Sequence, residues 1–305
     1  MVLSWRWWTW AAWCAGALLA LPVLGLGTGG LVAYGAGVPA SALVAGAITG
    51  TLKRGRVRSD RQDLAGIAVL YVVVVSLFGL AFTGFGTDNV LGLFLCFAAG
   101  MLVGVAGPIV YTVWLRRRPL SSLGLGANRW KSALALSVAL AAIQLLVTLV
   151  GRRLPANPED WVPLLVMSLT VGAFETVFFR GFIQDRLRAV GGQAAGVGGG
   201  AALYAVYHVG YGMRGLELVF LFALGTVYAS AYALVRNGLV LWPFLTPLGS
   251  FFNNVTNADI ELPWASILGF LDVLGLMAGV LWLARRHSKK TRAAFSGVAH
   301  EERKR

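Results

Sequence analysis

A few ionisable and amide side chains interrupt the long apolar stretches of this sequence, where they could carry out chemistry. They are Glu175, Arg180, His208, Asp272, Gln144, Asn253 and Asn254. The other charged residues lie close enough to the ends of apolar stretches to reach water. Because an ionisable group surrounded by hydrocarbon is costly, it is rare unless it serves a function. Each of these residues is therefore a candidate functional residue.

Glu175 and His208 are the candidates for proton transfer, since carboxylates and imidazoles are common general acids and bases. Tyr204 precedes His208 by four residues, so the two rings share one face of a helix. The glycine-rich run 196–200 before them would let this helix pack closely against another. A single histidine in a membrane more often makes a hydrogen bond between helices, but a carboxylate on the adjacent helix favours a catalytic role.

Arg180 and Asp272 have less obvious roles. Arg180 follows Glu175 by five residues, which is about 140° further around a helix. The two side chains need not touch within the helix, so Arg180 either contacts a neighbouring helix or extends to the cytoplasmic surface. Asp272 lies inside the last apolar stretch, and nothing near it in the sequence explains its presence.

Asn253 and Asn254 end an apolar stretch that contains Pro243 and Pro247. Prolines four residues apart interrupt the hydrogen bonds of the backbone, which a membrane helix tolerates where it faces protein or a water-filled cavity. An amide at such a place could donate a hydrogen bond to a developing oxyanion. The alternative is that the two amides only cap the segment at the membrane interface.

The composition identifies lipid as the solvent for much of the chain. Of its 305 residues, 57% are hydrophobic and 13% are charged, whereas a soluble domain has about 25% charged residues. The net charge of +13 comes from short basic clusters between apolar runs, which argues against a nucleic-acid-binding face. The two cysteines, Cys14 and Cys96, both lie in apolar runs and make a disulfide framework or a cysteine metal site improbable.

Counting about 20 apolar residues per span predicts ten membrane helices. The expected spans are Trp7–Leu26, Leu31–Leu52, Leu64–Phe85, Val90–Leu115, Ser132–Val150, Trp161–Phe182, Ala194–Gly212, Leu216–Val235, Leu239–Asn257 and Trp264–Ala284. With the N-terminus in the cytoplasm, 23 of the 26 lysines and arginines fall on the cytoplasmic side, as the positive-inside rule requires. The sequence thus predicts an all-α polytopic membrane helical bundle of about ten transmembrane helices, with N- and C-termini cytoplasmic.

The motifs in the second half of the chain resemble a known family. Glu-x4-Arg-Gly on one helix, an aromatic-x3-His on the next, and a broken helix that ends in Asn are together similar to the CPBP family (CAAX protease and bacteriocin-processing, or Abi) of intramembrane proteases. The resemblance covers residues 116–284. It leaves residues 1–115 as an N-terminal four-helix membrane extension and residues 285–305 as a basic cytoplasmic tail, which we expect to be disordered.

The resemblance implies a role for each matching residue. Glu175 and His208 would activate a water molecule, and Arg180 would complete the first motif. Tyr204 would support the second motif. In the third motif an asparagine would supply part of the oxyanion hole, and Asn253 and Asn254 both match it.

Two positions depart from the family pattern. Thr176 stands where a second glutamate is expected, and the position four residues before the asparagine holds Gly249 or Ser250 in place of histidine. Loss of one oxyanion donor lowers a rate by about 10²–10³-fold without abolishing it. A register that pairs Ser250 with Asn254 favours an active enzyme, whereas one that pairs Gly249 with Asn253 favours an inactive relative.

We expect no cofactor and no tightly bound metal. A catalytic zinc ion takes three protein ligands, and only Glu175 and His208 are available at membrane depth. The sequence leaves open whether these two residues alone bind a metal ion.

The sequence thus predicts an intramembrane endopeptidase that cleaves a peptide or a membrane-associated precursor. The first alternative is an inactive family member that acts as a membrane binding or immunity protein. A proton-coupled transporter with Glu175, His208 and Asp272 as its relay ranks last, because no paired broken helices appear in two matching halves. Expected partners are the lipid bilayer and a peptide or membrane-protein substrate, with no nucleic acid. A composition rich in Ala, Gly and Arg but poor in Lys favours a bacterial cell membrane and makes a prenylated substrate less expected.

Overall fold

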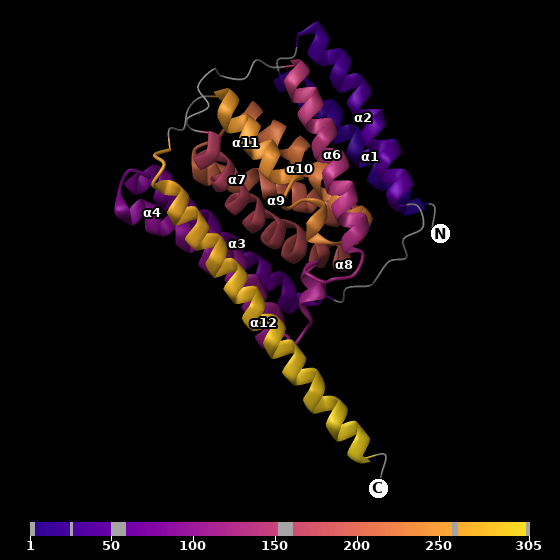
Figure 1. Cartoon of the computed structure of the whole chain (residues 1–305), viewed down its shortest axis with the longest axis vertical. Coiled ribbons are helices and arrows are strands. Elements are labelled where there is room, and N and C mark those ends of the chain that lie inside the picture. Colours follow the sequence, from indigo (N-terminus) through magenta and orange to yellow (C-terminus); the bar gives the residue numbers. More distant parts are fainter. Residues whose placement is uncertain (1–3, 25–26, 50–58, 152–160, 258–261, 303–305) are drawn as a thin grey trace.

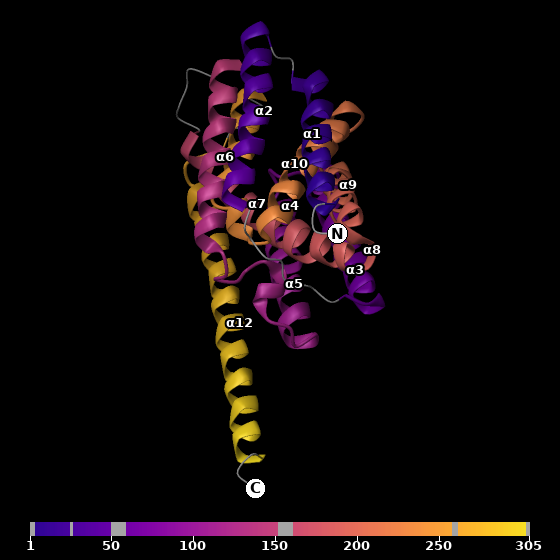
Figure 2. The same ribbon diagram turned by 90° about the vertical axis from the view of Figure 1, so that its right-hand side faces the viewer.

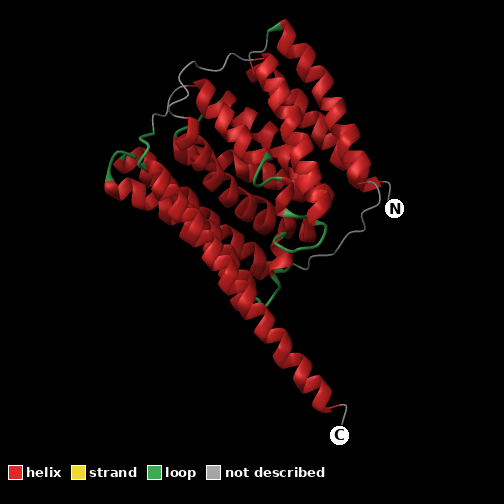
Figure 3. Ribbon diagram, viewed as in Figure 1, coloured by secondary structure: helices red, strands yellow, loops and turns green. Residues whose placement is uncertain are grey.

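The computed structural model describes residues 4–24, 27–49, 59–151, 161–257 and 262–302. All regular structure in these ranges is helical, and no strand occurs in them (Figure 3). The α-helices are α1 (Ser4–Leu24), α2 (Thr28–Thr49), α3 (Arg61–Gly79), α4 (Val90–Phe97), α5 (Gly107–Val110), α6 (Trp130–Gly151), α7 (Trp161–Glu175), α8 (Asp185–Ala194), α9 (Gly200–Tyr207), α10 (Leu216–Val235), α11 (Leu245–Asn257) and α12 (Ser266–Glu302). The prediction of an all-α protein is therefore confirmed.

Shorter helical segments of other types join several of these helices. The π-helical ones are Leu80–Phe85, Ala98–Ala106, Tyr111–Leu115, Thr176–Gln184 and Ala195–Gly199. The 3₁₀ turns are Leu120–Leu123, His208–Tyr211 and Gly238–Val240. Some of these segments extend an α-helix without a break, so that one continuous rod contains two or three of them.

Seven helices in the described ranges are long and apolar enough to cross a membrane, judged by length and composition. Large apolar side chains such as Val32, Leu43 and Val90 are exposed on them, as expected of surfaces that contact lipid. The chain is thus a multi-pass membrane protein. The count of about ten crossings and the cytoplasmic location of both termini stay predictions, and α11, with 13 residues, is shorter than a full span.

One of the seven apolar stretches runs from Trp161 to Tyr211 and folds back on itself. Gly192 has a positive φ of 79° and interrupts the helix, a conformation that costs glycine little because it has no Cβ. Past this point the chain returns along its own path, since Gly196 lies against Arg188 and Gly200 against Gln184. The predicted close packing of the glycine-rich run is confirmed, and its neighbour is the preceding helix.

Helices from both ends of the chain surround the central helices α7, α9 and α10. Helix α1 packs along α10 and α2 along α6, whereas α12 packs along α7 and the segment Ala98–Ala106. In Figure 1, α1, α2 and α6 occupy one side of the bundle, and α3, α4 and α12 occupy the other. The helices of residues 1–115 therefore flank the central helices on two sides.

Helix α12 continues to Glu302 and projects beyond the rest of the bundle (Figure 2). The division of the chain into an extension, a core and a disordered basic tail at residues 285–305 stays a prediction. The basic residues after Ala284 extend a helix that begins among apolar neighbours, and this continuity lets the helix propagate at little cost.

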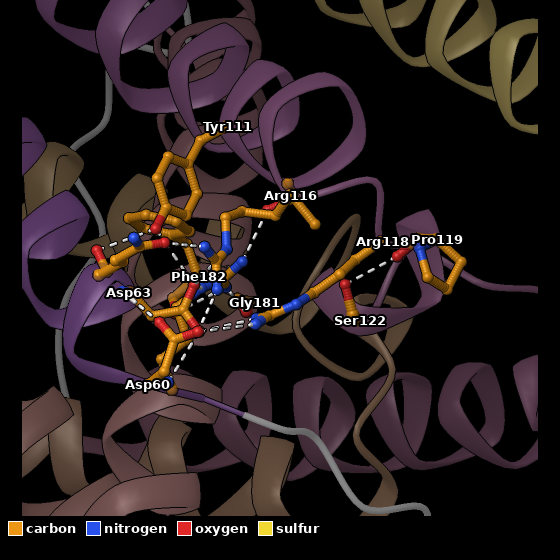
Figure 4. Close-up of polar contacts among 12 residues, drawn as sticks. Asp60, Asp63, Tyr111, Arg116, Arg118, Pro119, Ser122, Gly181 and Phe182 are labelled. Carbon is orange, nitrogen blue, oxygen red and sulfur yellow. Dashed lines mark hydrogen bonds and ion pairs between the residues drawn. The ribbon is translucent and has the colours of Figure 1, made fainter.

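Arginines from two of the predicted basic clusters meet around Asp60 and Asp63 (Figure 4). Asp63, fully buried near the start of α3, accepts a hydrogen bond of 2.7 Å from Arg118 and lies 3.6 Å from Arg186. Arg186 is itself 1% exposed and donates to Thr112 at 2.7 Å. The exposed Asp60 pairs with Arg116. These ion pairs fasten α3 and the segment after α5 to the central hairpin.

A second ion-pair cluster fastens α10 to the same hairpin. The buried Asp185 accepts hydrogen bonds from the Tyr232 hydroxyl at 2.9 Å and from Arg236 at 3.0 Å. Arg188 lies 3.6 Å from the same carboxylate. Asp185 and Arg186 are consecutive in the sequence. One turn of the hairpin is therefore held to α10 through Asp185 and to α3 through Arg186.

The shared location of these charges leads to a prediction about topology. Reporter fusions after Arg61, Arg129, Arg236 and Arg305 are expected to read as cytoplasmic, and fusions after Asp88 and Asp259 as external, because basic loops are retained inside. A dual alkaline phosphatase and fluorescent-protein reporter measures this. An external signal after Arg305 would contradict the even number of crossings.

Candidate active site

Glu175 is the last residue of α7, and its carboxylate is held by two tyrosines of the returning helix. The Tyr207 hydroxyl donates to Oε1 at 2.6 Å, and the Tyr204 hydroxyl lies 3.5 Å from Oε2. The residue is 8% exposed. Two hydroxyl donors from one neighbouring helix therefore fix the orientation of a buried carboxylate.

His208 begins the 3₁₀ turn that follows α9 and is also 8% exposed. Its Nδ1 lies 2.8 Å from the carbonyl oxygen of Tyr204. A carbonyl can only accept, so Nδ1 carries the hydrogen and Nε2 keeps a lone pair. The ring centroids of His208 and Tyr207 are 4.0 Å apart. Glu175 and His208 thus share Tyr204 and Tyr207 as immediate neighbours.

Arg180 is buried beside this pair. It is 2% exposed, and its guanidinium lies over the Tyr204 ring at 5.0 Å from the centroid. The alternative in which Arg180 extends to the cytoplasmic surface is wrong, because Tyr204 offers a cation–π contact inside the bundle. Among the described residues its Nη1 atom has no hydrogen-bond partner, which leaves a donor of a permanent cation free within the site.

Aromatic side chains enclose the carboxylate and the imidazole. Tyr207 contacts the rings of Phe174, Phe179, Phe78 and Tyr211 at centroid distances of 4.6 to 6.2 Å. Such an apolar surrounding lowers the local dielectric constant and so strengthens the interactions between charges inside it. The rigidity of the stacked rings also holds Glu175 and His208 in one arrangement.

The third-motif residues lie on α11, which packs along α7. Pro247 and Thr246 sit against Gly172, one helical turn before Glu175. Asn254 and Ser250 are partly buried, and the Asn253 side chain lies outside the described part of the structure. Among the described side chains, no hydrogen bond joins Asn254 or Ser250 to the Glu175–His208 pair.

Two further candidates do not contribute to this site. Thr176, at the position of the second glutamate, is buried and turns its methyl group toward Gly238, where an added Cβ would lie 2.9 Å away. Asp272 is exposed on α12. It does not extend the buried Glu175 cluster into a chain of proton-carrying groups.

The described part of the bundle also contains a cleft of about 220 Å³. Its walls come from α1, α2, α6, α10 and α11, and they include Trp13, Tyr34, Gln144, Tyr228, Gly249 and Phe252. Glu175 itself does not line the cleft. Tyr228 lines the cleft and is buried.

Sequence reasoning missed one of the tyrosines that complete this site. Tyr207 is the closest partner of Glu175 and lies next to His208 in the sequence. Tyr204, by contrast, was expected beside His208 from its spacing of four residues. The available signal was that a tyrosine at membrane depth needs a partner for its hydroxyl.

The described residues contain no group of three or more His, Cys, Asp or Glu side chains close enough to hold a metal ion. At the site, the described side chains of these four types are Glu175 and His208. The site therefore contains a carboxylate, an imidazole nitrogen with a lone pair, and a guanidinium nitrogen that has no hydrogen-bond partner among the described residues. All three lie in apolar surroundings. Such groups suit the activation of water by proton transfer.

The fold and the site together define a class of protein. It is a polytopic membrane bundle that carries a buried carboxylate and a buried imidazole on one helical hairpin. Residues 157–246 match the family model described as type II CAAX prenyl endopeptidase, Rce1-like. This match confirms the resemblance to CPBP proteases and identifies the segment as an Rce1-like domain, which spans under a third of the chain. It includes Glu175, Arg180 and His208 but ends before Asn253. No curated protein and no solved structure matched the chain.

Proposed function

We propose that this protein is an intramembrane endopeptidase in which Glu175 and His208 activate a water molecule. One observation carries the proposal. The Glu175 carboxylate is hydrogen-bonded by Tyr207 at 2.6 Å and approached by Tyr204 at 3.5 Å, and both tyrosines lie in α9, directly before the turn that begins with His208. The two helices are therefore fastened together at the position of the proposed base.

The proposed step uses two acceptors for the two hydrogens of one water molecule. One hydrogen is donated to Glu175 and the other to Nε2 of His208, whose Nδ1 hydrogen is fixed on the Tyr204 carbonyl. Glu175 takes the proton while the water oxygen attacks the peptide carbonyl carbon. The carbon–nitrogen bond then breaks, and Glu175 returns the proton to the leaving amine. The products are one carboxylate-ended and one amine-ended peptide.

The substrate class we propose is a peptide or a membrane-associated precursor that reaches the site from within or beside the bilayer. Exposed apolar side chains on the spanning helices support contact with lipid. The family model is named for prenylated CAAX substrates, so lipidation of the substrate is a variable for the test. The bilayer of a bacterial cell and the absence of a nucleic-acid partner stay part of the proposal.

The test is cleavage by the purified protein in proteoliposomes. Three probes are used: a farnesylated CAAX-type peptide, the same peptide without the lipid, and a proteome-derived peptide library. Mass spectrometry identifies the new termini. We expect termini that appear with the wild-type protein and are absent with Glu175→Ala. The proposed protease function would be contradicted if the new termini persist in that variant. It would also be contradicted if no probe yields new termini with the wild-type protein.

The second candidate is an inactive relative that binds a membrane partner. One observation favours it: Gly249 has no side chain, and Thr176 turns toward Gly238, so two groups of the family pattern are missing. This candidate predicts that the wild-type protein and Glu175→Ala behave alike in the cleavage assay.

A further inference from the structure

The two groups of the proposed catalytic pair are covered on all sides by other parts of the bundle. Glu175 and His208 are each 8% exposed. A substrate must come within hydrogen-bond reach of these groups, directly or through one water molecule. One of the elements that cover them therefore has to move aside when a substrate binds, and its position shows from which side the substrate arrives.

The end of α3 that lies away from its ion pairs, Val75–Gly79, covers the turn that begins with His208. We call it the far end of α3. A Cβ built on Gly210 in this turn would lie 3.2 Å from the Cβ of Phe78. The Phe78 ring lies 4.8 Å from the Tyr211 ring, centroid to centroid. Phe78 is 5% exposed, so α3 and the turn are in direct contact across this ring.

A series of aromatic rings leads from His208 to the surface of the bundle. The Tyr211 ring lies 5.5 Å from the His208 imidazole and 4.5 Å from the Phe82 ring. Phe82 is 38% exposed, and Phe85 near it is exposed as well. Both belong to an apolar stretch that is long enough to cross a membrane, so their exposed faces contact lipid. The far end of α3 is therefore the place where the bilayer comes near the imidazole.

Polar contacts tie α3 to the central hairpin at its start and in its middle. Asp63 pairs with Arg186, and the Tyr71 hydroxyl donates to the Leu203 carbonyl oxygen at 2.8 Å. Among the described residues, no hydrogen bond or ion pair joins residues 72–97 to the hairpin. The far end of α3 is thus held to the hairpin by apolar and aromatic contacts.

Such contacts are the easiest ones to open inside a membrane. Lipid chains are as apolar as the side chains that they replace, so helices in a bilayer lose little when apolar surfaces separate. The segment Leu80–Phe85 that follows α3 is π-helical, a geometry that is rare and frequent at functional sites. The far end of α3 can therefore leave the turn without exposing an unpaired polar group to lipid.

Helices α10 and α11 are fastened to the hairpin more firmly. The Gln184 amide donates to the Ala229 carbonyl oxygen of α10 at 2.7 Å. The Trp242 indole, just before α11, donates to the Leu169 carbonyl oxygen at 2.9 Å. Movement of either helix would break a hydrogen bond in surroundings where no water replaces it.

We propose that the substrate reaches Glu175 and His208 from the bilayer, between the far end of α3 and the turn His208–Tyr211, and that Phe78 and Phe82 bind its apolar part. This inference rests on the proposed function and adds the entry route and the substrate class, which is a chain with an apolar segment inside the membrane. Both phenylalanines lie outside the matched segment 157–246. The first part of the chain thus supplies a surface for the substrate.

A disulfide across the entry tests this route. Phe78→Cys and Gly210→Cys are combined in a background in which Cys14 and Cys96 are replaced by alanine. The 3.2 Å between the two Cβ positions is a few tenths of an ångström below the usual range of about 3.5–4.5 Å for a disulfide. We expect oxidation to lower peptide cleavage by about tenfold or more, because the entry cannot open, and reduction to restore it.

The matched control is a disulfide between the two legs of the hairpin. A Cβ built on Gly200 would lie 3.3 Å from the Cβ of Gln184, so Gln184→Cys with Gly200→Cys is linked over nearly the same distance. Its oxidised and reduced forms are expected to cleave within about twofold of each other, because these legs stay together. Undiminished cleavage in the oxidised Phe78→Cys, Gly210→Cys protein, with the cross-link verified by mass spectrometry, would overturn the route. Equal losses in both proteins would overturn it as well.

A second measurement reports access to the site without relying on activity. The cysteine of His208→Cys, in the same cysteine-free background, is alkylated with N-ethylmaleimide. Adding Phe78→Ala is expected to raise the alkylation rate by about tenfold, because loss of a buried ring weakens the closed arrangement. Phe251→Ala is the control, since Phe251 is also buried but packs in a different cluster on α11. Equal rates in the two variants would show that Phe78 does not cover the site.

The outcomes distinguish this inference from the proposed function. Cleavage that depends on Glu175 but is unaffected by the cross-link at Phe78 leaves the proposed function in place and overturns the entry route. Absence of cleavage in the wild-type protein overturns the proposed function and the substrate-binding role of Phe78 and Phe82. The alkylation rates then still decide whether Phe78 closes the way to residue 208.

Discussion

Glu175→Gln is expected to lower peptide cleavage by about a thousandfold, within the 10²–10⁴-fold range of general-base contributions, while the protein stays folded. Glutamine has the shape of glutamate, and its carbonyl oxygen can still accept the Tyr207 hydrogen bond that Oε1 accepts at 2.6 Å. It cannot take a proton from water. The loss is therefore expected in kcat and not in substrate binding.

The measurement is the initial rate of cleavage in proteoliposomes, together with the thermal midpoint of each variant. Glu217→Gln is the matched control: Glu217 is exposed in the first turn of α10 and accepts a hydrogen bond from the Arg214 backbone N–H at 3.0 Å. It should cleave at the wild-type rate. A Glu175→Gln protein that retains full turnover would show that another group removes the proton.

Asp63→Asn is expected to destabilise the protein by about 3–5 kcal/mol, the cost of leaving a buried charge without its partner. Asp63 is fully buried, and Arg186 beside it is 1% exposed. Arg118 donates to the carboxylate at 2.7 Å, and Tyr111 donates at 3.2 Å. Asparagine keeps one acceptor oxygen but carries no charge, so the buried guanidinium of Arg186 loses its counter-ion.

Asp60→Asn is the control for this prediction, because the two aspartates share one capping box at the start of α3. Asp60 Oδ1 accepts from the Asp63 N–H at 3.0 Å, and Asp63 Oδ2 accepts from the Asp60 N–H at 3.2 Å. Asparagine is also a good N-cap, and the Asp60 side chain is 49% exposed. We expect it to cost less than about 1 kcal/mol, as exposed ion pairs do. Thermal unfolding in detergent gives both values, and equal losses would contradict the importance of burial.

The destabilised variant also bears on the active site. Arg186 lies on the same leg of the hairpin as Glu175, with the segment Thr176–Gln184 between them. Asp63 holds Arg186 from one side, and Tyr232 and Arg236 hold the neighbouring Asp185 from the other. These ion pairs therefore anchor the end of the segment that follows Glu175 to α3 and α10.

Several features of the protein were predictable from its sequence for energetic reasons. So few charged residues cannot cover a water-soluble protein of this length, which leaves the bilayer as its solvent. An ionisable residue in that solvent is costly, so Glu175, Arg180 and His208 stood out from the apolar residues around them. The glycines at 196–200 predicted close helix packing, because only small residues let backbones approach.

The partners of those residues depended on the tertiary structure. Tyr207 lies 32 residues from Glu175 in the sequence, and Gln144 and Tyr228 reach Gly249 from two different helices. Such contacts depend on how each helix is rotated about its axis. A helix such as α10, which is apolar all round, carries no stripe that tells which side faces the interior.

The same packing decided between the two alternatives that the sequence left open for Arg180. Arg180 stays inside because the Tyr204 ring lies over its guanidinium, a partner that no local spacing indicates. The sequence alone determined which groups had to be removed from lipid, and the packing of helices distant in the chain decided what each of them meets.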